Sequence, residues 1–334
     1  MINQNYRYSL HEVSNYEDWM ILYEKCTVKT LPQTWEYGSA KAKVEFWSIK
    51  RYKINNNLNQ PIGIVQLLYI NIPIIGKIVR INKGPLLTNN ISNNDSTIPL
   101  SIIHFLCNEA KKNKWIMLQI APLINFSDYN YNNLLNSGFQ NKDYCSADTS
   151  IINLLPNKEE LLISFDGKWR NQLKKGLKSN IFVINTNSDN IYFEKMLALY
   201  NTQQKINNFK GTSNKILKAL FNNQTKNFRF NLFIAIVNNG TDDEIIGFLV
   251  TFQYSNFAEY IIGISTEAGK KLQVNSVLLW EALTFSKNCN NHYFDLGGLS
   301  EDTPSGIANF KRGLNGEPLK LIGEWRKFFN FFNS

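Results

Sequence analysis

Residues 292–316 read His-Tyr-Phe-Asp-Leu-Gly-Gly-Leu-Ser-Glu-Asp-Thr-Pro-Ser-Gly-Ile-Ala-Asn-Phe-Lys-Arg-Gly-Leu-Asn-Gly, and they indicate more about fold and function than any other stretch. A short apolar strand is predicted to end at Asp295, directly before Gly297 and Gly298. Glycine has no side chain, so the backbone here can approach a ligand closely. The Asp295 carboxylate is predicted either to orient a bound donor or to hold the backbone amides of this loop.

A polar loop then leads to Phe310 and Lys311, and Gly313 follows shortly after. An aromatic ring beside a lysine offers one flat stacking surface and one fixed positive charge. The segment is therefore predicted to line a binding site.

The two halves of the chain repeat one order of predicted elements. Residues 61–65 follow an Asn-rich turn and read as the second arm of a hairpin, and residues 244–248 have the same place in the second half. A further strand follows in each half, at residues 77–80 and 259–264.

A helix and then an apolar strand complete the repeat. Residues 101–112 correspond to residues 276–287, where apolar side chains recur at helical spacing. The stretches 115–120 and 292–296 read as the strands that follow. Each half therefore has the order helix, hairpin, strand, helix, strand.

This duplication predicts two similar α/β units. We expect an N-terminal domain at residues 1–150 and a C-terminal domain at residues 151–317, with the tail from about residue 318 to residue 334 packing on the first domain.

Two further segments combine aromatic and basic residues. Residues 168–178 place Arg170 beside a tryptophan in a predicted basic helix, which is either a solvated face or a contact strip for phosphate. Residues 33–41 place Trp35 and Lys41 in another predicted helix. Either the lysine, on the first turns of this helix, supplies a point charge for phosphate, or the segment is a helix start with the aromatic ring as a packing anchor.

These three segments resemble motifs of the FemABX family: D-x-x-G…FK near the C-terminus, W-R-…-K at the start of the second half, and Q-S-x-x-W-x-x-x-K near the N-terminus. The last motif has Thr34 in place of serine and Tyr37 in place of tryptophan. The resemblance implies two tandem acetyltransferase-like (GNAT) domains, each with a mixed central sheet flanked by helices. It also implies a transferase that uses aminoacyl-tRNA to add an amino acid to an acceptor amine, as in peptidoglycan precursors.

The resemblance assigns Phe310 to stacking on the terminal adenine of the tRNA, Lys311 to the oxyanion of the reaction, and Lys41 to the acceptor's diphosphate. The predicted catalytic residues are Lys311 and Asp295, and the predicted donor contacts are Phe310, Gly297, Gly298 and Gly313. The predicted acceptor contacts are Lys41, Arg170, Trp35, Tyr254 and Tyr260, the two tyrosines lying on central strands where they either line the cleft or pack in the core.

One departure concerns the acceptor. FemX-type proteins carry an R-x-x-x-Y pair after the second basic segment, and this chain has none at residues 211–218, where Lys210, Lys215 or Lys218 are the available substitutes. The acceptor is therefore left open as a cell-wall precursor, another peptide or an amino sugar.

Two alternatives remain for the function. An N-acyltransferase could use acyl-CoA on a nucleotide-linked amino sugar, but residues 266–275 have one glycine where a pyrophosphate-binding loop has a pair. A protein of this fold could also bind nucleic acid without catalysis.

The composition agrees with an anionic partner. The formal net charge of +9 favours nucleic acid, nucleotide-linked substrates or a membrane face. Neither the four cysteines nor the three histidines have metal-ligand spacing, and an aminoacyl-tRNA donor needs no cofactor, so none is expected. No stretch approaches the roughly 20 apolar residues that span a bilayer. We expect a cytoplasmic enzyme, whose Phe-rich end at residues 328–332 either docks on its own domain or touches a membrane.

Overall fold

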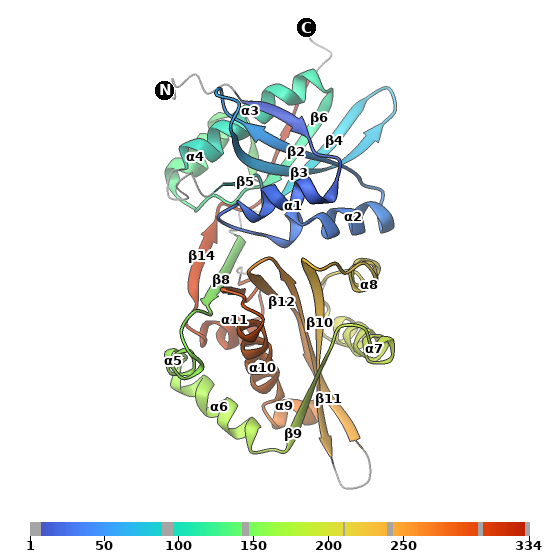
Figure 1. Ribbon diagram of the computed structural model, residues 1–334, viewed down its shortest axis with the longest axis vertical. Coiled ribbons are helices and arrows are strands. Elements are labelled where there is room, and N and C mark those ends of the chain that lie inside the picture. The colour runs from blue at the N-terminus through green and yellow to red at the C-terminus, as the bar shows by residue number, and fades with distance from the viewer. Residues whose placement is uncertain are drawn as a thin grey trace. The chain divides into compact units, whose positions relative to one another are not determined.

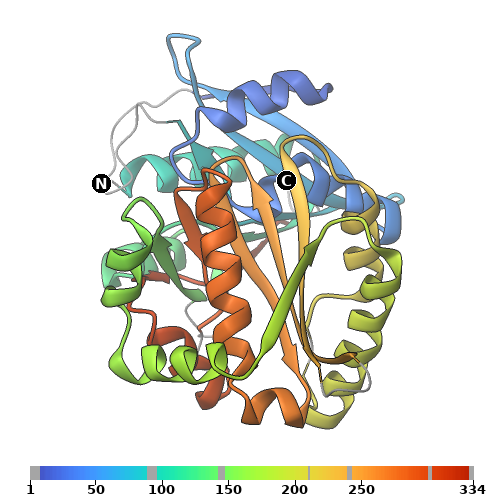
Figure 2. The ribbon, with the colours of Figure 1, turned by 60° about the horizontal axis from the view of Figure 1, so that its bottom comes forward.

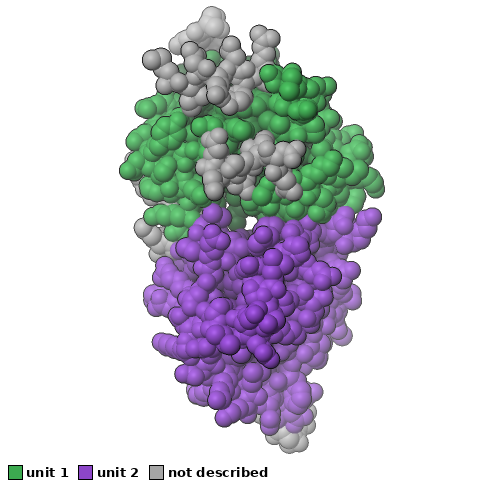
Figure 3. Space-filling view, turned by 60° about the vertical axis from the view of Figure 1, so that its left-hand side comes forward, with its two compact units in different colours: residues 1–148, 320–334 green, residues 149–319 purple. Residues whose placement is uncertain are grey.

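The computed structural model describes residues 8–88, 96–141, 147–209, 211–238, 243–299 and 303–330. The chain forms two units (Figure 3). Each unit has its own sheet and its own hydrophobic core. Unit 1 comprises residues 1–148 and 320–334, and unit 2 comprises residues 149–319.

The helices of unit 1 are α1 (Tyr16–Glu24), the 3-10 helix η1 (Leu31–Gln33), α2 (Trp35–Val44), α3 (Thr97–Lys112) and α4 (Asp128–Asn136). Its strands are β1 (Ser9–Glu12), β2 (Ser48–Asn55), β3 (Pro61–Ile72), β4 (Gly76–Asn82), β5 (Leu86–Leu87), β6 (Trp115–Ala121), β7 (Gln140–Asn141) and β15 (Trp325–Phe328). They form a sheet of order β1-β2-β3-β4-β6-β15-β7, and β5 also pairs with β3.

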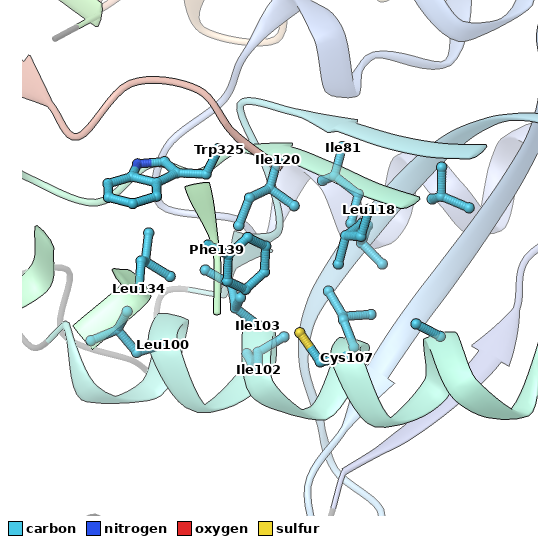
Figure 4. Close-up of a cluster of buried hydrophobic side chains, with 14 of the residues drawn as sticks. Ile81, Leu100, Ile102, Ile103, Cys107, Leu118, Ile120, Leu134, Phe139 and Trp325 are labelled. Atoms are coloured by element: carbon cyan, nitrogen blue, oxygen red, sulfur yellow. The ribbon is translucent and has the colours of Figure 1, made fainter. Parts of the chain in front are cut away.

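In unit 1, β4 and β6 run parallel, so the chain must cross over between them, and α3 makes this crossing. The apolar side of α3 packs on the sheet (Figure 4). The labelled core side chains there are Ile81, Leu100, Ile102, Ile103, Cys107, Leu118, Ile120, Leu134, Phe139 and Trp325.

The last strand, β15, lies between β6 and β7 in the sheet of unit 1. Trp325 on this strand is fully buried, and its ring packs edge-on against Tyr131 at 4.9 Å between centroids. Its Nε1–H donates a hydrogen bond of 2.8 Å to the carbonyl oxygen of Ile322. The C-terminal segment thus completes the core of the unit that the N-terminal part of the chain begins.

The helices of unit 2 are α5 (Lys158–Ser164), α6 (Gly167–Leu177), α7 (Asn190–Asn207), α8 (Asn214–Asn222), α9 (Glu267–Lys271), α10 (Val274–Asn288) and α11 (Ser305–Arg312). Its strands are β8 (Ala147–Asn153), β9 (Ile181–Thr186), β10 (Phe228–Asn238), β11 (Asp243–Tyr254), β12 (Phe257–Ser265), β13 (Tyr293–Asp295) and β14 (Glu317–Leu321). The sheet order is β14-β8-β13-β12-β11-β10-β9.

Alternation along β10 explains why helices cover both faces of this sheet. The ring of Phe230 packs on Phe221 of α8, whereas the ring of Phe233 packs on Phe285 of α10. α10 accordingly lies against one face, and α7 and α8 lie against the other (Figures 1 and 2).

Both units therefore show the predicted order. The hairpins β2–β3 and β10–β11 are each followed by a strand, β4 or β12, then by a helix, α3 or α10, and then by a parallel strand, β6 or β13. The predicted helices and strands of the repeat are confirmed.

Trp325→Ala should destabilise the protein by about 3–5 kcal/mol, because it removes a fully buried ring from the core of unit 1. The free energy of unfolding in urea measures this loss. Phe328→Ala on the same strand is the matched control, since Phe328 is 54% exposed and should change that free energy by less than about 0.5 kcal/mol. Equal effects of the two variants would contradict the described register of β15.

Candidate active site

A cavity of about 830 Å³ in unit 2 is lined by the first turns of α6, by the start of α10 and by α11. Its charged lining residues are Asp166, Lys168, Lys270 and Arg312. Its aromatic lining residues are Trp169, Tyr260 and Phe310. Of the predicted site residues, Phe310, Gly313 and Tyr260 line this cavity.

Asp295 holds the loop that follows β13. Its Oδ1 accepts a hydrogen bond of 2.8 Å from the backbone N–H of Gly297 and another from the Thr149 hydroxyl, which also contacts the Gly297 carbonyl oxygen at 3.0 Å. The side chain of Asp295 is buried and does not line the cavity. Of its two predicted roles, the structure therefore shows the one that fixes the loop.

Gly297 is required by the same loop. Its φ is +70°, a left-handed value that other residues rarely adopt, and an added Cβ would lie 3.0 Å from the carbonyl oxygen of Tyr260. Gly298 carries no such restriction, because a Cβ there would meet no atom within 4 Å.

Lys311 is buried behind the cavity. Its Nζ donates a hydrogen bond of 3.1 Å to the carbonyl oxygen of Gly298 and lies 5.0 Å from the centre of the Tyr260 ring. Burial lowers the pKa of Lys311 to about 8, although the nearby carboxylates of Asp295 and Glu259 favour its charged form. Lys311 is therefore poised to lose its charge just above neutral pH.

Trp169 and Phe310 form an aromatic floor. Their ring centres are 6.1 Å apart, and the buried Trp169 ring also packs edge-on against Phe165 at 5.0 Å between centroids. Gly313 packs close to Trp169, where an added Cβ would lie 3.4 Å from Cδ1. The Trp169 Nε1 is buried without a hydrogen-bond partner among the described residues. Phe310 is only partly buried, so its ring is available to a ligand.

The electrostatics of the cavity favour an anion. α10 begins after Gln273, which has a left-handed φ of +61° and gives the helix no side-chain cap, so the positive end of the helix is not neutralised locally. Lys168 and Arg312 form no ion pair among the described residues, whereas Lys270 pairs with Glu267 at 2.6 Å. A negatively charged group is therefore favoured beside α10.

The basic helix predicted at residues 168–178 is α6, but Arg170 lies outside the cavity. Its Nη1 donates to the carbonyl oxygen of Ile163 at 3.3 Å. The residues of α6 that face the cavity are Lys168, Trp169 and Gln172, because residues about one turn apart share a helix face. Lys168 belongs to the basic segment 168–178, and its position one helical turn from Gln172 identifies it from the sequence as a residue of the same helix face.

Tyr254 and Tyr260 do not share a cavity. Tyr254 is buried, and its hydroxyl donates to the Glu259 carboxylate at 2.7 Å. It lines a separate cavity of about 340 Å³ together with Arg229 and Asn291. Of the two alternatives for these tyrosines, core packing describes Tyr254 at the β11–β12 turn, whereas Tyr260, farther along β12, lines the larger cavity. Contact of either tyrosine with an acceptor stays a prediction.

Lys41 in unit 1 is not at the start of a helix. α2 begins at Trp35, where the Thr34 hydroxyl accepts a hydrogen bond from the N–H of Tyr37, and Lys41 lies in its last turn. There its ammonium donates to both carboxylate oxygens of Glu45, at 2.8 and 2.9 Å. The expectation of a lysine on the first turns is thus corrected, and its contact with an acceptor phosphate stays a prediction.

Trp35 is held by an arginine that the sequence analysis missed. The Arg51 guanidinium lies 3.5 Å from the centre of a Trp35 ring and donates to the Trp35 carbonyl oxygen at 2.9 Å. Arg51 also donates to Gln66 Oε1 at 2.7 Å and to the Ser39 hydroxyl at 3.1 Å. The aromatic residue is therefore a packing anchor of α2, and Arg51 covers one face of its ring.

The three substitutes for the missing Arg/Tyr pair differ in what the structure describes. Lys218 of α8 is paired with Glu194 at 2.8 Å, and Lys215 is exposed on the same helix. Lys210 lies outside the described residues.

Within the part of the chain that the structure describes, no three His, Cys, Asp or Glu residues come together as a metal site. The helices in that part include none with the length and apolarity of a membrane span.

Residues 165–312, most of unit 2, match the family model described as an acetyltransferase (GNAT) domain. A comparison with curated protein sequences gives no match. Among solved structures, FemX is similar to 97% of this chain over 98% of its own length, with a TM-score of 0.76 and 14% identity.

Two other solved structures are similar over almost the whole chain. A tandem GNAT protein from the clavulanic acid biosynthesis pathway covers 96% of this chain and 98% of its own, with a TM-score of 0.55 and 9% identity. L-PGS from Bacillus licheniformis covers 95% and 92%, with a TM-score of 0.51 and 11% identity. The fold is thus a tandem GNAT fold like that of FemX, which confirms the predicted fold class and the resemblance.

Gly297→Ala should lower the free energy of unfolding by about 1–2 kcal/mol, because alanine is strained at a left-handed φ. Gly298→Ala is the control, and we expect it to change that free energy by no more than about 0.5 kcal/mol. Urea unfolding followed by circular dichroism measures both. If the two substitutions had the same effect, the loop would not have the described conformation.

Proposed function

We propose that this protein is an aminoacyltransferase that takes an amino acid from aminoacyl-tRNA and joins it to an acceptor amine. The observation that carries the proposal is the cavity of unit 2, which is lined together by Phe310, by the uncapped start of α10 and by the cations Lys168 and Arg312, which form no ion pair among the described residues. The 3′ end of a tRNA has the matching chemistry, because its terminal base can stack and its phosphates are anionic.

The reaction needs only the two substrates. The acceptor amine attacks the ester carbonyl of the aminoacyl-tRNA, which forms the C–N bond and a tetrahedral oxyanion. The oxyanion then collapses to the amide as the C–O bond to the ribose breaks. The ribose hydroxyl leaves with a proton, and the amine loses one. The residues that bind the two substrates therefore accelerate the step by positioning and by stabilising the oxyanion.

Lys311 is the proposed oxyanion donor, as the FK resemblance implies. In the structure its ammonium is bound to the Gly298 carbonyl and faces the Tyr260 ring, which lines the cavity. The contact with Gly298 supports a role in which Lys311 also holds the loop next to the bound ester. Because Lys311 is buried, the interaction of its charge with a nearby oxyanion would be stronger than in water.

On the acceptor side, Lys41 and Arg170 are proposed to contact phosphate, and a peptide or cell-wall precursor is the proposed acceptor. An acceptor diphosphate would have to displace Glu45 from Lys41. The donor is made and used in the cytoplasm, which is the proposed location of the protein.

Acyl-CoA is the second candidate donor, because the start of α10 would also favour its pyrophosphate. Against it, the single glycine of the preceding segment, Gly269, is buried against β11, where an added Cβ would lie 2.2 Å from the Ile246 carbonyl oxygen. Gly269 therefore serves the packing of α9, and its backbone does not form an open cradle for phosphate.

Charged tRNA should bind saturably at moderate salt and more tightly than either uncharged tRNA or acetyl-CoA. Phe310→Ala should weaken this binding by about 1–3 kcal/mol, because it removes the stacking surface. Phe182→Ala is the matched control, since Phe182 of β9 is 62% exposed and does not line the cavity. Fluorescence anisotropy with a labelled charged tRNA measures all three proteins.

The salt dependence adds a second readout. A plot of the logarithm of the association constant against the logarithm of the salt concentration has a slope that counts phosphate contacts. Lys168→Ala should reduce this slope by about one contact, whereas Lys174→Ala, on the same helix but outside the cavity, should leave it unchanged. Acyl-CoA would be the donor if acetyl-CoA bound tightly and tRNA bound equally well with and without its amino acid. Binding of tRNA with no transfer to any amine would favour a non-catalytic nucleic-acid-binding protein.

The pH dependence of transfer should be bell-shaped. The rate rises as the acceptor amine loses its proton, and it falls above about pH 8, because the lowered pKa of Lys311 means that its positive charge is lost as the pH rises through that value. Lys311→Met should lower the rate constant by about 10²–10³-fold. Rapid-quench measurement of kcat/KM between neutral and alkaline pH tests this.

Lys311→Arg separates charge from geometry. Arginine stays charged at alkaline pH, so any remaining activity of this variant should no longer fall above about pH 8. A wild-type rate that keeps rising with pH, together with a nearly active Lys311→Met variant, would exclude Lys311 as the oxyanion donor.

A further inference from the structure

The β3–β4 hairpin of unit 1 ends in an exposed apolar turn that reads Ile72-Pro73-Ile74-Ile75. The side chain of Ile74 is fully exposed, and Ile75 is 50% exposed. In Figure 1 this hairpin extends outward from the rest of unit 1. Apolar side chains at such a position contribute nothing to the core of the unit, so folding does not account for them.

The backbone at Ile74 makes this choice of residue more unusual. Its φ is +69°, a left-handed value that is especially unfavourable for a β-branched side chain. The other described non-glycine residues with positive φ are Asn59, Lys83, Lys114, Asn180, Asn208, Ser255, Gln273, Asn290 and Asn315. None of these other residues is β-branched, whereas Ile74 is. An asparagine or glycine would suit this turn better, so the isoleucine serves something outside the fold.

Two lysines lie next to this turn, and two more lie shortly before one of them at the end of α3. The N–H of Lys77 donates to the carbonyl oxygen of Lys114 at 2.9 Å, which places both residues directly below the turn. Lys111 and Lys112 end α3, three and two residues before Lys114, and both are exposed. Of these lysines, Glu109 forms an ion pair with Lys112, at 2.6 Å between Nζ and Oε1.

Phe46 adds a second apolar group at the same end of the sheet. It is 97% exposed and lies two residues before β2, whose first residue, Ser48, pairs with Tyr69 near the end of β3. Exposed apolar side chains bordered by lysines match an interface in which acyl chains lie beneath anionic headgroups.

We propose that the hairpin turn inserts Ile74 and Ile75 into the surface of a bilayer that contains anionic lipids, with Lys77, Lys111 and Lys114 on the headgroups. Phe329 of the Phe-rich end is buried in the core of unit 1 and is not available for this contact, and residues 331–334 lie outside the described residues. The inference does not depend on the proposed reaction, and its test involves no tRNA and no acceptor.

Vesicle sedimentation tests the proposal with the full chain. The wild type should bind vesicles of phosphatidylcholine with phosphatidylglycerol and should bind pure phosphatidylcholine much less. Ile74→Gly with Ile75→Ser should lower the partition coefficient by about tenfold or more, because each buried isoleucine contributes strongly to insertion. Leu58→Ser in the β2–β3 turn is the matched control, since Leu58 is 71% exposed and should have no effect.

Two further variants distinguish apolar insertion from loss of folding and from charge alone. Ile74→Gly relieves the unfavourable φ, so its thermal unfolding temperature should be equal to or higher than that of the wild type while its vesicle binding falls. Lys111→Gln with Lys114→Gln should weaken binding about fivefold per lysine, only on anionic vesicles and less at high salt.

Failure of the wild type to bind anionic vesicles would overturn the proposal, and so would equal binding by the hairpin variant. A concentration-dependent dimer that is lost in the hairpin variant, with no vesicle binding, would overturn it in favour of contact with a second copy. Light scattering after size-exclusion chromatography detects that outcome.

Discussion

The buried carboxylate of Asp295 holds the loop on which the cavity of unit 2 depends. It lies at the end of β13, bound to the N–H of Gly297 and to Thr149, and Gly297 takes a left-handed φ there. The carbonyl oxygen of Gly298 then receives the Lys311 ammonium. One carboxylate thus connects the sheet to α11, and through α11 to Phe310, which faces the cavity.

The parallel strand pair in each unit is the constraint behind this placement. Parallel neighbours need a crossing helix, and in unit 2 that helix is α10, whose start reaches the cavity beside α6. Aromatic packing between Phe165, Trp169 and Phe310 then brings α6 and α11 together around the same space. The anion-favouring end of α10 and the aromatic floor are therefore products of a single topology.

Several site residues could be placed from the sequence, and others could not. Phe310 and Gly313 were found because an aromatic–lysine pair between glycines is visible in the chain, and both line the cavity. The basic pattern of residues 168–178 predicts Arg170, whereas the structure places Lys168 in the cavity lining, and helical spacing distinguishes the two. The exposed Ile74 gave no signal, because an apolar residue in a turn is distinguished only once its φ and its exposure are known.

By itself the sequence determined the repeated order of elements, and with it the tandem fold, because apolar periodicity and turn residues are local properties of the chain. It also pointed to Phe310 and Gly313, which line the cavity of unit 2. Only the tertiary structure decided that Asp295 holds a loop, that Lys41 is engaged by Glu45, and that Tyr254 and Tyr260 lie in different cavities. Such outcomes depend on burial and on which strands become neighbours, and these are set by contacts between residues far apart in the chain.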